Sequence, residues 1–201
     1  MDNIARFRNF IQDFTALIDR SADDEELILK SGKALLSDLI ENDDWLPEQF
    51  AIADPDRYQQ YLLYCDPMER FSVVSFVWGP GQKTPVHDHT VWGMVGVMRG
   101  SEICEEYNQD TDSGNLVAAG SHQIPPGGID LVSPQIGDIH RVSNALTDRA
   151  SISIHVYGAN IGAVSRHVYE TPSGISSEFI SGYSNSVVPN LWDRSAERPV
   201  S

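Results

Sequence analysis

The sequence predicts a mainly β protein, a small antiparallel barrel or sandwich, that begins with α-helices. Residues 4–18 and 27–40 carry apolar side chains at helical spacing. After about residue 70, short strand-like runs alternate with turns rich in Gly, Pro and Asn, as in barrels and sandwiches. A length of 201 residues suits one domain. We therefore expect a helical segment over 1–55 packed on the barrel, a barrel core over 70–170 and a C-terminal loop or hairpin over 171–201.

The helical part is expected to contain two helices and one short turn of helix. The second helix should start near residues 21–24, where Ser and Asp can cap it. Glu25 and Glu26 then complement the dipole of its first turn. A third short helix is expected over 47–53, while residues 58–63 fit either a helix or the first strand.

The strands of the barrel are predicted from runs of β-branched and aromatic residues between turn signals. Turns are indicated by Gly, Pro, Asp and Ser at 79–81, 99–100, 112–114 and 125–128. The expected strands cover 71–78, 91–98, 101–107, 120–124, 129–132, 140–144 and 150–157.

The charge of the chain excludes some partners. The formal net charge is −15, which repels phosphate backbones and anionic lipids, so we expect no nucleic-acid and no membrane partner. No apolar run is long enough for a membrane span, and residues 1–14 do not resemble a signal peptide. Cys65 and Cys104 cannot form a disulfide framework, so a cytoplasmic location is expected. An anionic substrate would need a local positive charge, such as a metal or an Arg.

Two of the six histidines form the pair His87-Asp88-His89 in a strand-prone region. The two-residue period of a strand places both imidazoles on one face and Asp88 on the other. Two neighbouring imidazoles can chelate a metal ion. The alternative is a pair of surface histidines beside a turn.

The sequence around this pair follows a specific spacing. Gly81 is followed by five residues, the His-x-His pair, three residues, Gly93, six residues and Gly100, and residues 134–144 read PQIGDIHRVSN. These segments resemble the two motifs of the cupin superfamily, a small antiparallel barrel or jelly roll. The family's usual Glu ligand is replaced by Gly93, and the second motif has one extra residue. The resemblance implies three metal ligands: His87, His89 and His140.

Three neutral imidazoles would leave the charge of a divalent ion uncompensated. Such a site favours ligands that bring negative charge, such as a thiolate or a carboxylate. Imidazole ligands alone do not identify the metal, because several divalent ions bind them. The alternative is a structural zinc, for which His122 or His155 could supply a fourth ligand.

Residues 151–157 alternate strictly between polar and apolar side chains. Ser153, His155 and Tyr157 should therefore share one face of a strand. Inside a barrel, these groups would have to hydrogen-bond one another or a ligand, and a relay would orient the Tyr157 hydroxyl. The alternative is the solvent face of an ordinary amphipathic strand.

Together, residues 58–162 resemble the thiol dioxygenase branch of the cupins, the cysteine dioxygenase family. The resemblance implies Fe(II) bound by three histidines, and a relay of Ser153, His155 and Tyr157. It also implies that both atoms of O₂ are added to a small thiol, which becomes a sulfinic acid. Tyr157 would then hydrogen-bond the substrate or an oxygen intermediate. The implied partners are the thiol and O₂, and we expect a monomer or weak homo-oligomer.

Two departures from the mammalian-type enzymes concern the substrate. Their Tyr-x-Arg motif, whose Arg binds the cysteine carboxylate, reads Tyr-Gln-Gln here and ends at Gln60. Their cross-linked Cys is replaced by Gly93. This pattern resembles the bacterial 3-mercaptopropionate dioxygenases, in which an Arg nine residues after the relay Tyr is thought to address the carboxylate. Here that position is Arg166, and the alternative is an unremarkable surface Arg on a loop.

The expected reaction is therefore the conversion of 3-mercaptopropionate to 3-sulfinopropionate, with Gln60, Arg166 and Tyr157 binding the substrate. L-Cysteine as the substrate, another metal-dependent cupin reaction and a non-catalytic ligand-binding cupin remain alternatives. Other residues are expected to have structural roles: Asp138 and Asn144 in turns and outer hydrogen bonds, Trp92 in the core, His122 and His167 on the surface or in loops, and Cys65 and Cys104 as small apolar groups.

Overall fold

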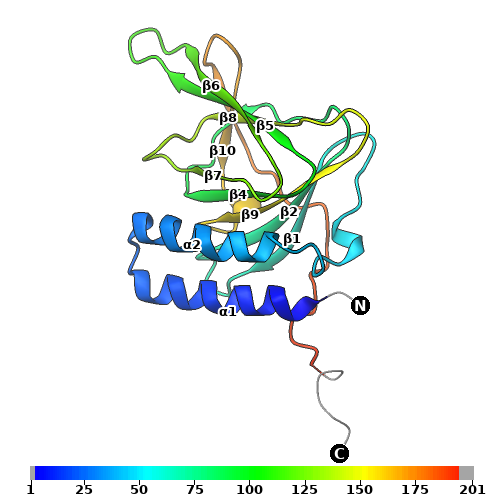
Figure 1. Ribbon diagram of the computed structural model, residues 1–201. Helices are drawn as coiled ribbons and strands as arrows, with labels where there is room; N and C mark the ends of the chain where they lie inside the picture. The colour runs from blue at the N-terminus through cyan, green and yellow to red at the C-terminus, as the bar shows by residue number, and fades with distance from the viewer. Residues whose placement is uncertain (1–2, 195–201) are drawn as a thin grey trace, which may run out of the picture.

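The protein has three layers, a helical pair and two β-sheets, in a computed structural model that describes residues 3–194 (Figure 1). The helices are α1 (Ile4–Ser21) and α2 (Glu25–Ile40), with 3₁₀ turns η1 (Glu48–Phe50) and η2 (Ile161–Ala163). The strands are β1 (Gln59–Cys65), β2 (Ser72–Trp78), β3 (Val86–His87), β4 (Gly93–Arg99), β5 (Glu102–Gln109), β6 (Leu116–Ile124), β7 (Ile129–Val132), β8 (His140–Asn144), β9 (Ser151–Tyr157), β10 (Arg166–Tyr169) and β11 (Ser176–Phe179).

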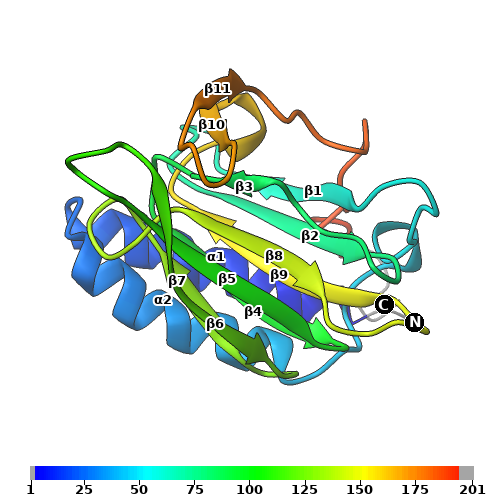
Figure 2. The same ribbon diagram turned by 90° about the horizontal axis from the view of Figure 1, so that it is seen from above.

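The strands form two antiparallel sheets. One has five strands in the order β1-β2-β9-β4-β7, and the other has six in the order β11-β10-β3-β8-β5-β6. Seen from above, β8 and β5 lie over β9 and β4, and both helices lie beneath the five-stranded sheet (Figure 2). The mainly β barrel with N-terminal helices is thus confirmed. This arrangement encloses the polar face of β9 between the sheets.

The helices form because they can bury one apolar face against the five-stranded sheet. Asp24 caps α2, since its Oδ1 accepts a hydrogen bond from the Leu27 N–H at 3.0 Å. Phe7 and Phe14 of α1 are fully buried, and burial of each stabilises the fold by about 1.5–3 kcal/mol. Gly32 lets α2 approach β4, because a Cβ there would lie 2.4 Å from the Met94 Cε atom.

Some boundaries differ from those expected. Residues 47–53 contain only the 3₁₀ turn η1, which starts after Pro47, and residues 58–63 belong to strand β1. Strands β3, β10 and β11 have only two to four residues, too few for a periodic pattern. β10 and β11 pair as a hairpin that begins before residue 170. Of the C-terminal extension expected over 171–201, residues 195–201 lie outside the described residues.

The segment after β11 runs back along the outer edge of β1. The Gln60 N–H donates to Ser184 Oγ at 3.0 Å, and the Ser184 N–H donates to the Gln60 carbonyl at 2.9 Å. The Asn185 side chain binds both the N–H and the carbonyl of Leu62, at 2.8 and 2.9 Å. These contacts satisfy backbone groups that an edge strand would otherwise expose. They also hold the backbone of Gln60 in place.

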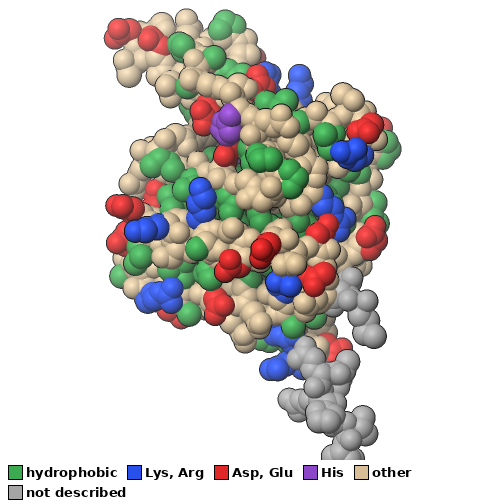
Figure 3. Space-filling view, in the orientation of Figure 1, with side chains coloured by type: hydrophobic (Ala, Val, Ile, Leu, Met, Phe, Trp, Pro, Cys, Tyr) green, Lys and Arg blue, Asp and Glu red, His purple; other side chains and the backbone are tan. Residues whose placement is uncertain are grey.

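The visible face of the molecule carries charged side chains of both signs among hydrophobic ones (Figure 3). On the face drawn in Figure 3, acidic and basic side chains are interspersed over the helices and the sheet edges. Within residues 3–194, no helix is long and apolar enough to cross a membrane.

Candidate metal centre and its relay

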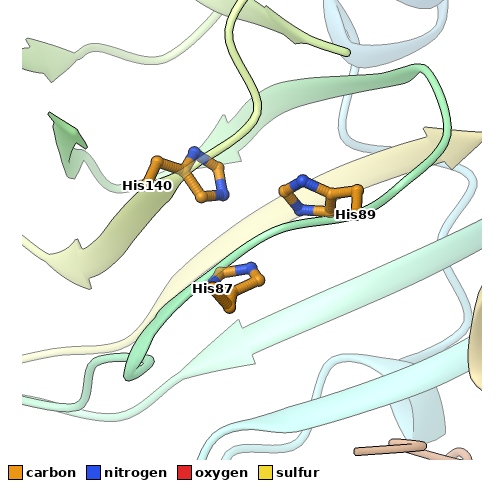
Figure 4. A group of neighbouring side chains, drawn as sticks. All are labelled: His87, His89 and His140. Atoms are coloured by element: carbon orange, nitrogen blue, oxygen red, sulfur yellow. The ribbon is translucent and has the colours of Figure 1, made fainter. Parts of the chain in front are cut away.

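Three histidines from the six-stranded side of the barrel meet in its interior. His87 of β3 pairs in register with His140 of β8, and His89 follows β3. Their ring centroids are 4.9 Å apart in each pair, and one nitrogen of each lies within 4.8 Å of the others. The three rings turn toward a common point (Figure 4). The six-stranded sheet therefore forms a triad of converging nitrogens.

Hydrogen bonds on the outer side fix two of these rings. His87 Nδ1 lies 3.1 Å from the Pro85 carbonyl oxygen, so this nitrogen carries the proton and donates. His89 Nδ1 lies 2.8 Å from Asp138 Oδ1, and Asp138 also accepts from the backbone N–H groups of His89 and Thr90. Both Nε2 atoms are left free to face the centre. Asp138 therefore hydrogen-bonds a histidine of the triad from outside it, as expected from the sequence.

The triad fits a divalent metal ion. Burial lowers the pKa of His87 to about 3, and it lowers the pKa of His140 well below its usual value, so both rings are neutral ligands. His89 Nε2 is buried without a hydrogen-bond partner among the described residues. Such an atom is costly unless a ligand binds it. We therefore infer that the three Nε2 atoms are the metal-binding atoms.

Ser153, His155 and Tyr157 of β9 form a continuous hydrogen-bonded chain inside the barrel. Ser153 Oγ is 2.8 Å from His155 Nε2, and His155 Nδ1 is 2.8 Å from Tyr157 Oη. All three side chains are buried, so the alternative of a solvent-facing strand is wrong. Burial lowers the pKa of His155 and raises that of Tyr157, which keeps the imidazole neutral and the phenol protonated.

This relay also bears on the structural-zinc alternative. Both ring nitrogens of His155 are already hydrogen-bonded, and the ring stacks on Phe76 with centroids 4.1 Å apart. His122 instead lies on the exposed strand β6, 2.7 Å from Asp130. Neither histidine is therefore a fourth ligand of the triad.

A cavity of about 210 Å³ connects the triad with the relay and with Arg166. Its lining includes His87, His140, Tyr157, Arg166 and Gln60. These residues come from five different strands, so the barrel brings together positions far apart in the sequence.

Arg166 is a buried cation at the wall of this cavity. It is the first residue of β10 and only 4% exposed, so the alternative of a surface Arg on a loop is wrong. Its guanidinium lies 4.7 Å above the Phe179 ring, and Nη2 donates to Ser181 Oγ at 2.7 Å. Its Nε has no partner among the described residues, and burial lowers its pKa. The side chain is therefore positioned by two neighbours but keeps a donor free.

Gly93 lies directly opposite Tyr157 in the pairing of β4 with β9. A Cβ atom at this position would lie 2.7 Å from Tyr157 Cδ1 and 3.0 Å from a methyl of Val132. Real Cβ atoms essentially never lie as close as 2.7 Å to another side chain. The absence of a side chain at residue 93 is thus what leaves room for the Tyr157 ring.

Most of the residues that were predicted to have structural roles have such roles in the structure. Asn144 donates to the carbonyls of Trp78 and Gly79, and Trp92 packs against the helix-side core. His122 and His167 are partly exposed but lie on strands, not in loops. Cys104 is buried as expected, yet its Sγ also lies 3.5 Å from His140 Nδ1. Nothing in the spacing of Cys104 indicated that contact.

A second group of possible ligand atoms, from Cys104, His122 and Asp130, lies within 4.8 Å of one another. His122 Nε2 and Asp130 Oδ2 are hydrogen-bonded to each other at 2.7 Å. Burial and the nearby carboxylates raise the pKa of the Cys104 thiol, which keeps it protonated. The His122 and Asp130 atoms of this group are thus already hydrogen-bonded to each other, whereas the Nε2 atom of His89 has no partner among the described residues.

Two facing antiparallel sheets with a three-histidine site between them define a metal-binding cupin, a double-stranded β-helix. The family model "Cysteine dioxygenase type I" matches residues 4–170 of the chain. The chain therefore belongs to the cysteine dioxygenase type I family, and it is a thiol dioxygenase with a three-histidine metal site.

Solved structures also resemble this chain. TT1209 from Thermus thermophilus is 16% identical, with a TM-score of 0.44 over 56% of this chain and 92% of that one. A Klebsiella pneumoniae protein with a double-stranded β-helix domain is 18% identical, with a TM-score of 0.43 over 60% and 94%. A Cupin 2 conserved barrel domain protein from Salinispora arenicola is 17% identical, with a TM-score of 0.41 over 57% and 86%.

Proposed function

We propose that this dioxygenase uses Fe(II) to convert 3-mercaptopropionate and O₂ into 3-sulfinopropionate. The observation that carries the proposal is Arg166, a buried guanidinium that lines the cavity beside the histidine triad and whose Nε has no partner among the described residues. A buried cation is costly without a counter-charge, and a carboxylate is the partner that matches its donor geometry. The substrate would therefore bring a carboxylate as well as a thiolate.

The charges of the cavity favour a substrate with two negative groups. His87, His89 and His140 as neutral ligands would leave a divalent ion with its full charge, and Arg166 adds another positive charge. A thiolate and a carboxylate together offset most of this charge. Gln60 lines the same cavity, and its amide is a neutral donor that can bind either oxygen of the carboxylate.

The same cavity disfavours the ammonium group of cysteine. Within residues 3–194, no Asp or Glu side chain lines the cavity, so an ammonium group would meet only cations and neutral groups. 3-Mercaptopropionate lacks this group. The missing acidic residue therefore supports the mercapto-acid over the amino acid.

Each side chain then has a defined task. His87, His89 and His140 would hold the iron, which when bound supplies a site for the thiolate and for activation of O₂. Tyr157 lines the cavity and hydrogen-bonds the bound substrate, while His155 and Ser153 hold its hydroxyl in position. Phe76 and Trp78 are buried walls that keep bulk water out. The partners are thus one small thiol and O₂.

The proposal is tested by steady-state O₂ uptake of the iron-loaded protein with 3-mercaptopropionate, L-cysteine and cysteamine. These thiols carry a carboxylate alone, both groups, or an amine alone. We expect kcat/KM to fall in that order. A protein that prefers cysteine would contradict the substrate assignment, while leaving its class unchanged.

The role of Arg166 is tested by Arg166→Gln. A charged hydrogen bond contributes about 1.5–3 kcal/mol, so kcat/KM for 3-mercaptopropionate should fall roughly 10- to 100-fold. The value for cysteamine, which has no carboxylate, should change little. Arg149→Gln is the matched control, because Arg149 is exposed and its side chain pairs with its neighbour Asp148. Equal losses for all three thiols would mean that Arg166 is structural.

A further inference from the structure

Glu102 of β5 lies fully buried next to the relay, with 0% of its surface exposed. Its Oε1 accepts a hydrogen bond from Ser151 Oγ at 3.3 Å, and its Oε2 is buried with no partner among the described residues. The Ser153 hydroxyl and the Trp78 indole N–H also favour its charged form, although both are hydrogen-bonded within the relay and not to Glu102. Carboxyl groups are almost never buried this completely, and the proposed chemistry does not yet use this one.

The hydrogen bonds at Ser153 allow only two arrangements. The Trp78 indole can only donate, and its Nε1 lies 3.2 Å from Ser153 Oγ, so Ser153 accepts there. Ser153 has a single hydroxyl proton. It can donate that proton to His155 Nε2 or to Glu102, but not to both.

The same limit applies along the rest of the relay. Burial keeps His155 neutral, so its ring carries one proton, and burial keeps Tyr157 protonated. If Ser153 donates to His155 Nε2, the ring proton is on Nδ1 and is donated to Tyr157 Oη. If His155 Nε2 donates to Ser153, then Nδ1 must accept from the Tyr157 hydroxyl. The direction at Ser153 therefore fixes the direction at Tyr157.

We propose that the protonation state of Glu102 sets the direction of this relay and thereby decides whether Tyr157 donates or accepts a hydrogen bond in the substrate cavity. When Glu102 is neutral, Ser153 donates to His155, and the Tyr157 hydroxyl proton is free for the cavity. When Glu102 is ionised, it takes the Ser153 proton, and Tyr157 donates backward to His155. The two states differ by the one proton of Glu102.

The surroundings of Glu102 favour the neutral state near neutral pH. Burial raises the pKa of this carboxyl more than the Ser153, Ser151 and Trp78 side chains lower it, so that the pKa is about 8. The negative charge of Asp130 on β7 contributes to this rise. Asp130 itself pairs with the exposed His122 of β6. The relay groups on β9 are neutral, so none of them stabilises the ionised carboxylate by charge.

The inference rests on the proposed role of Tyr157, but it can be tested without turnover. The metal-free protein, labelled with ¹⁵N and without any thiol, gives two-bond ¹H–¹⁵N correlation spectra that report which ring nitrogen of each histidine is protonated. The signals of His155 are those missing from His155→Gln. We expect the His155 proton to lie on Nδ1 at low pH and on Nε2 at high pH, with a midpoint near 8.

Two variants and one control test whether Glu102 is the group that titrates. In Glu102→Gln, the side-chain amide is a permanent donor to Ser153, so the His155 proton should stay on Nδ1 at every pH. Glu106→Gln is the matched control on the same strand, because Glu106 is exposed, and it should keep the wild-type transition. Asp130→Asn should lower the midpoint, because it removes a negative charge that raises the pKa of Glu102. This last variant tests the inference even if Glu102→Gln does not fold.

Turnover supplies a second readout. For the iron-loaded protein, kcat should fall about tenfold per pH unit on the alkaline side of the Glu102 transition, and Glu102→Gln should abolish that alkaline fall. A His155 proton that stays on one nitrogen across the pH range would overturn the inference. So would a transition that persists in Glu102→Gln. Neither result depends on which thiol the protein oxidises, so failure of the inference is distinguishable from failure of the proposed function.

Discussion

The Tyr157 hydroxyl is hydrogen-bonded to His155, and the Tyr157 side chain lines the cavity beside the triad. Replacing it with Phe removes the proton donor but keeps the ring that fills the space beside Gly93. We expect Tyr157→Phe to lower kcat by roughly 100-fold, the lower range for a lost proton donor. Bound iron, measured by elemental analysis, should stay the same, because Tyr157 is not a ligand. Unchanged turnover would contradict the role of the relay.

Asp138 holds the imidazole of His89 and two backbone N–H groups. The bond between His89 and the Asp138 carboxylate raises the basicity of Nε2, and loss of such a partner weakens metal binding by about 10- to 100-fold. We expect this loss for Asp138→Asn, measured by competition with a metal-binding dye. Asp148→Asn, at an exposed position, serves as the control. An unchanged affinity would mean that Asp138 only fixes the turn.

At the scale of elements, the C-terminal segment completes the sheet edge that carries Gln60. Asn185 bonds both backbone groups of Leu62, and Ser184 bonds those of Gln60. We expect Asn185→Ala to lower the free energy of unfolding by about 1–2 kcal/mol, since two edge hydrogen bonds are lost. It should also raise KM for 3-mercaptopropionate, because Gln60 is then held less firmly.

Urea unfolding and initial rates measure these two effects. Asn115→Ala is a suitable control, because Asn115 is exposed in the turn between β5 and β6. A variant that loses stability but keeps its KM would show that the segment only protects the edge of the sheet. That result would separate the structural role of the C-terminal segment from a role in binding.

The elements also show which parts of the fold a sequence can predict. The helices and most of the long strands carry enough residues for a periodic pattern, and their positions were predicted closely. The exceptions are β1, whose residues fit either a helix or a strand, and β6, which begins four residues before the expected 120–124. β3 and β10 are too short for such a pattern, yet they carry His87 and Arg166. Their places depend on pairing with strands distant in the sequence, such as β8. Only the three-dimensional fold reveals where these two short strands lie.

The residues of the candidate site also differ in how well the sequence predicts them. The histidine pair and the alternation of residues 151–157 are local patterns, so the sequence alone predicts that these side chains share one face of a strand. Glu102 and Ser181 left weaker signals, since they approach the relay and Arg166 from other strands or from the tail. The one available signal for Glu102 is its period-two phase with the buried Cys104 on β5. An acidic residue at an inward position deserves a search for its partner.

At the scale of the whole molecule, buried histidines couple folding of the metal-free protein to pH. Burial lowers the pKa of His87 from 6.5 to about 3, and it lowers those of His140 and His155. Below pH 6.5 these histidines bind protons in the unfolded chain but not in the folded one, so their contribution to stability is full above 6.5 and is lost as the pH falls toward 3. The raised pKa of Glu102 offsets part of this loss, because the folded chain binds that proton more tightly than the unfolded chain. The loss is on the order of 1.4 kcal/mol per pH unit for each histidine.

Urea midpoints of the metal-free protein between pH 7 and pH 5 test this coupling. We expect a clear decrease with falling pH, and the same decrease in the control His122→Gln, since His122 is exposed. Midpoints that do not change over this range would mean that the triad and the relay are hydrated and easily protonated. Such a result would argue against a dry, preformed metal site.

The central claim is that the triad, the relay and Arg166 together oxygenate a mercapto-acid. The most direct test supplies the iron-loaded protein with 3-mercaptopropionate and isotopically heavy O₂, and determines the product by mass spectrometry. We predict 3-sulfinopropionate in which both added oxygen atoms are heavy. Disulfide as the only product, or a sulfinate that takes an oxygen atom from water, would contradict the account.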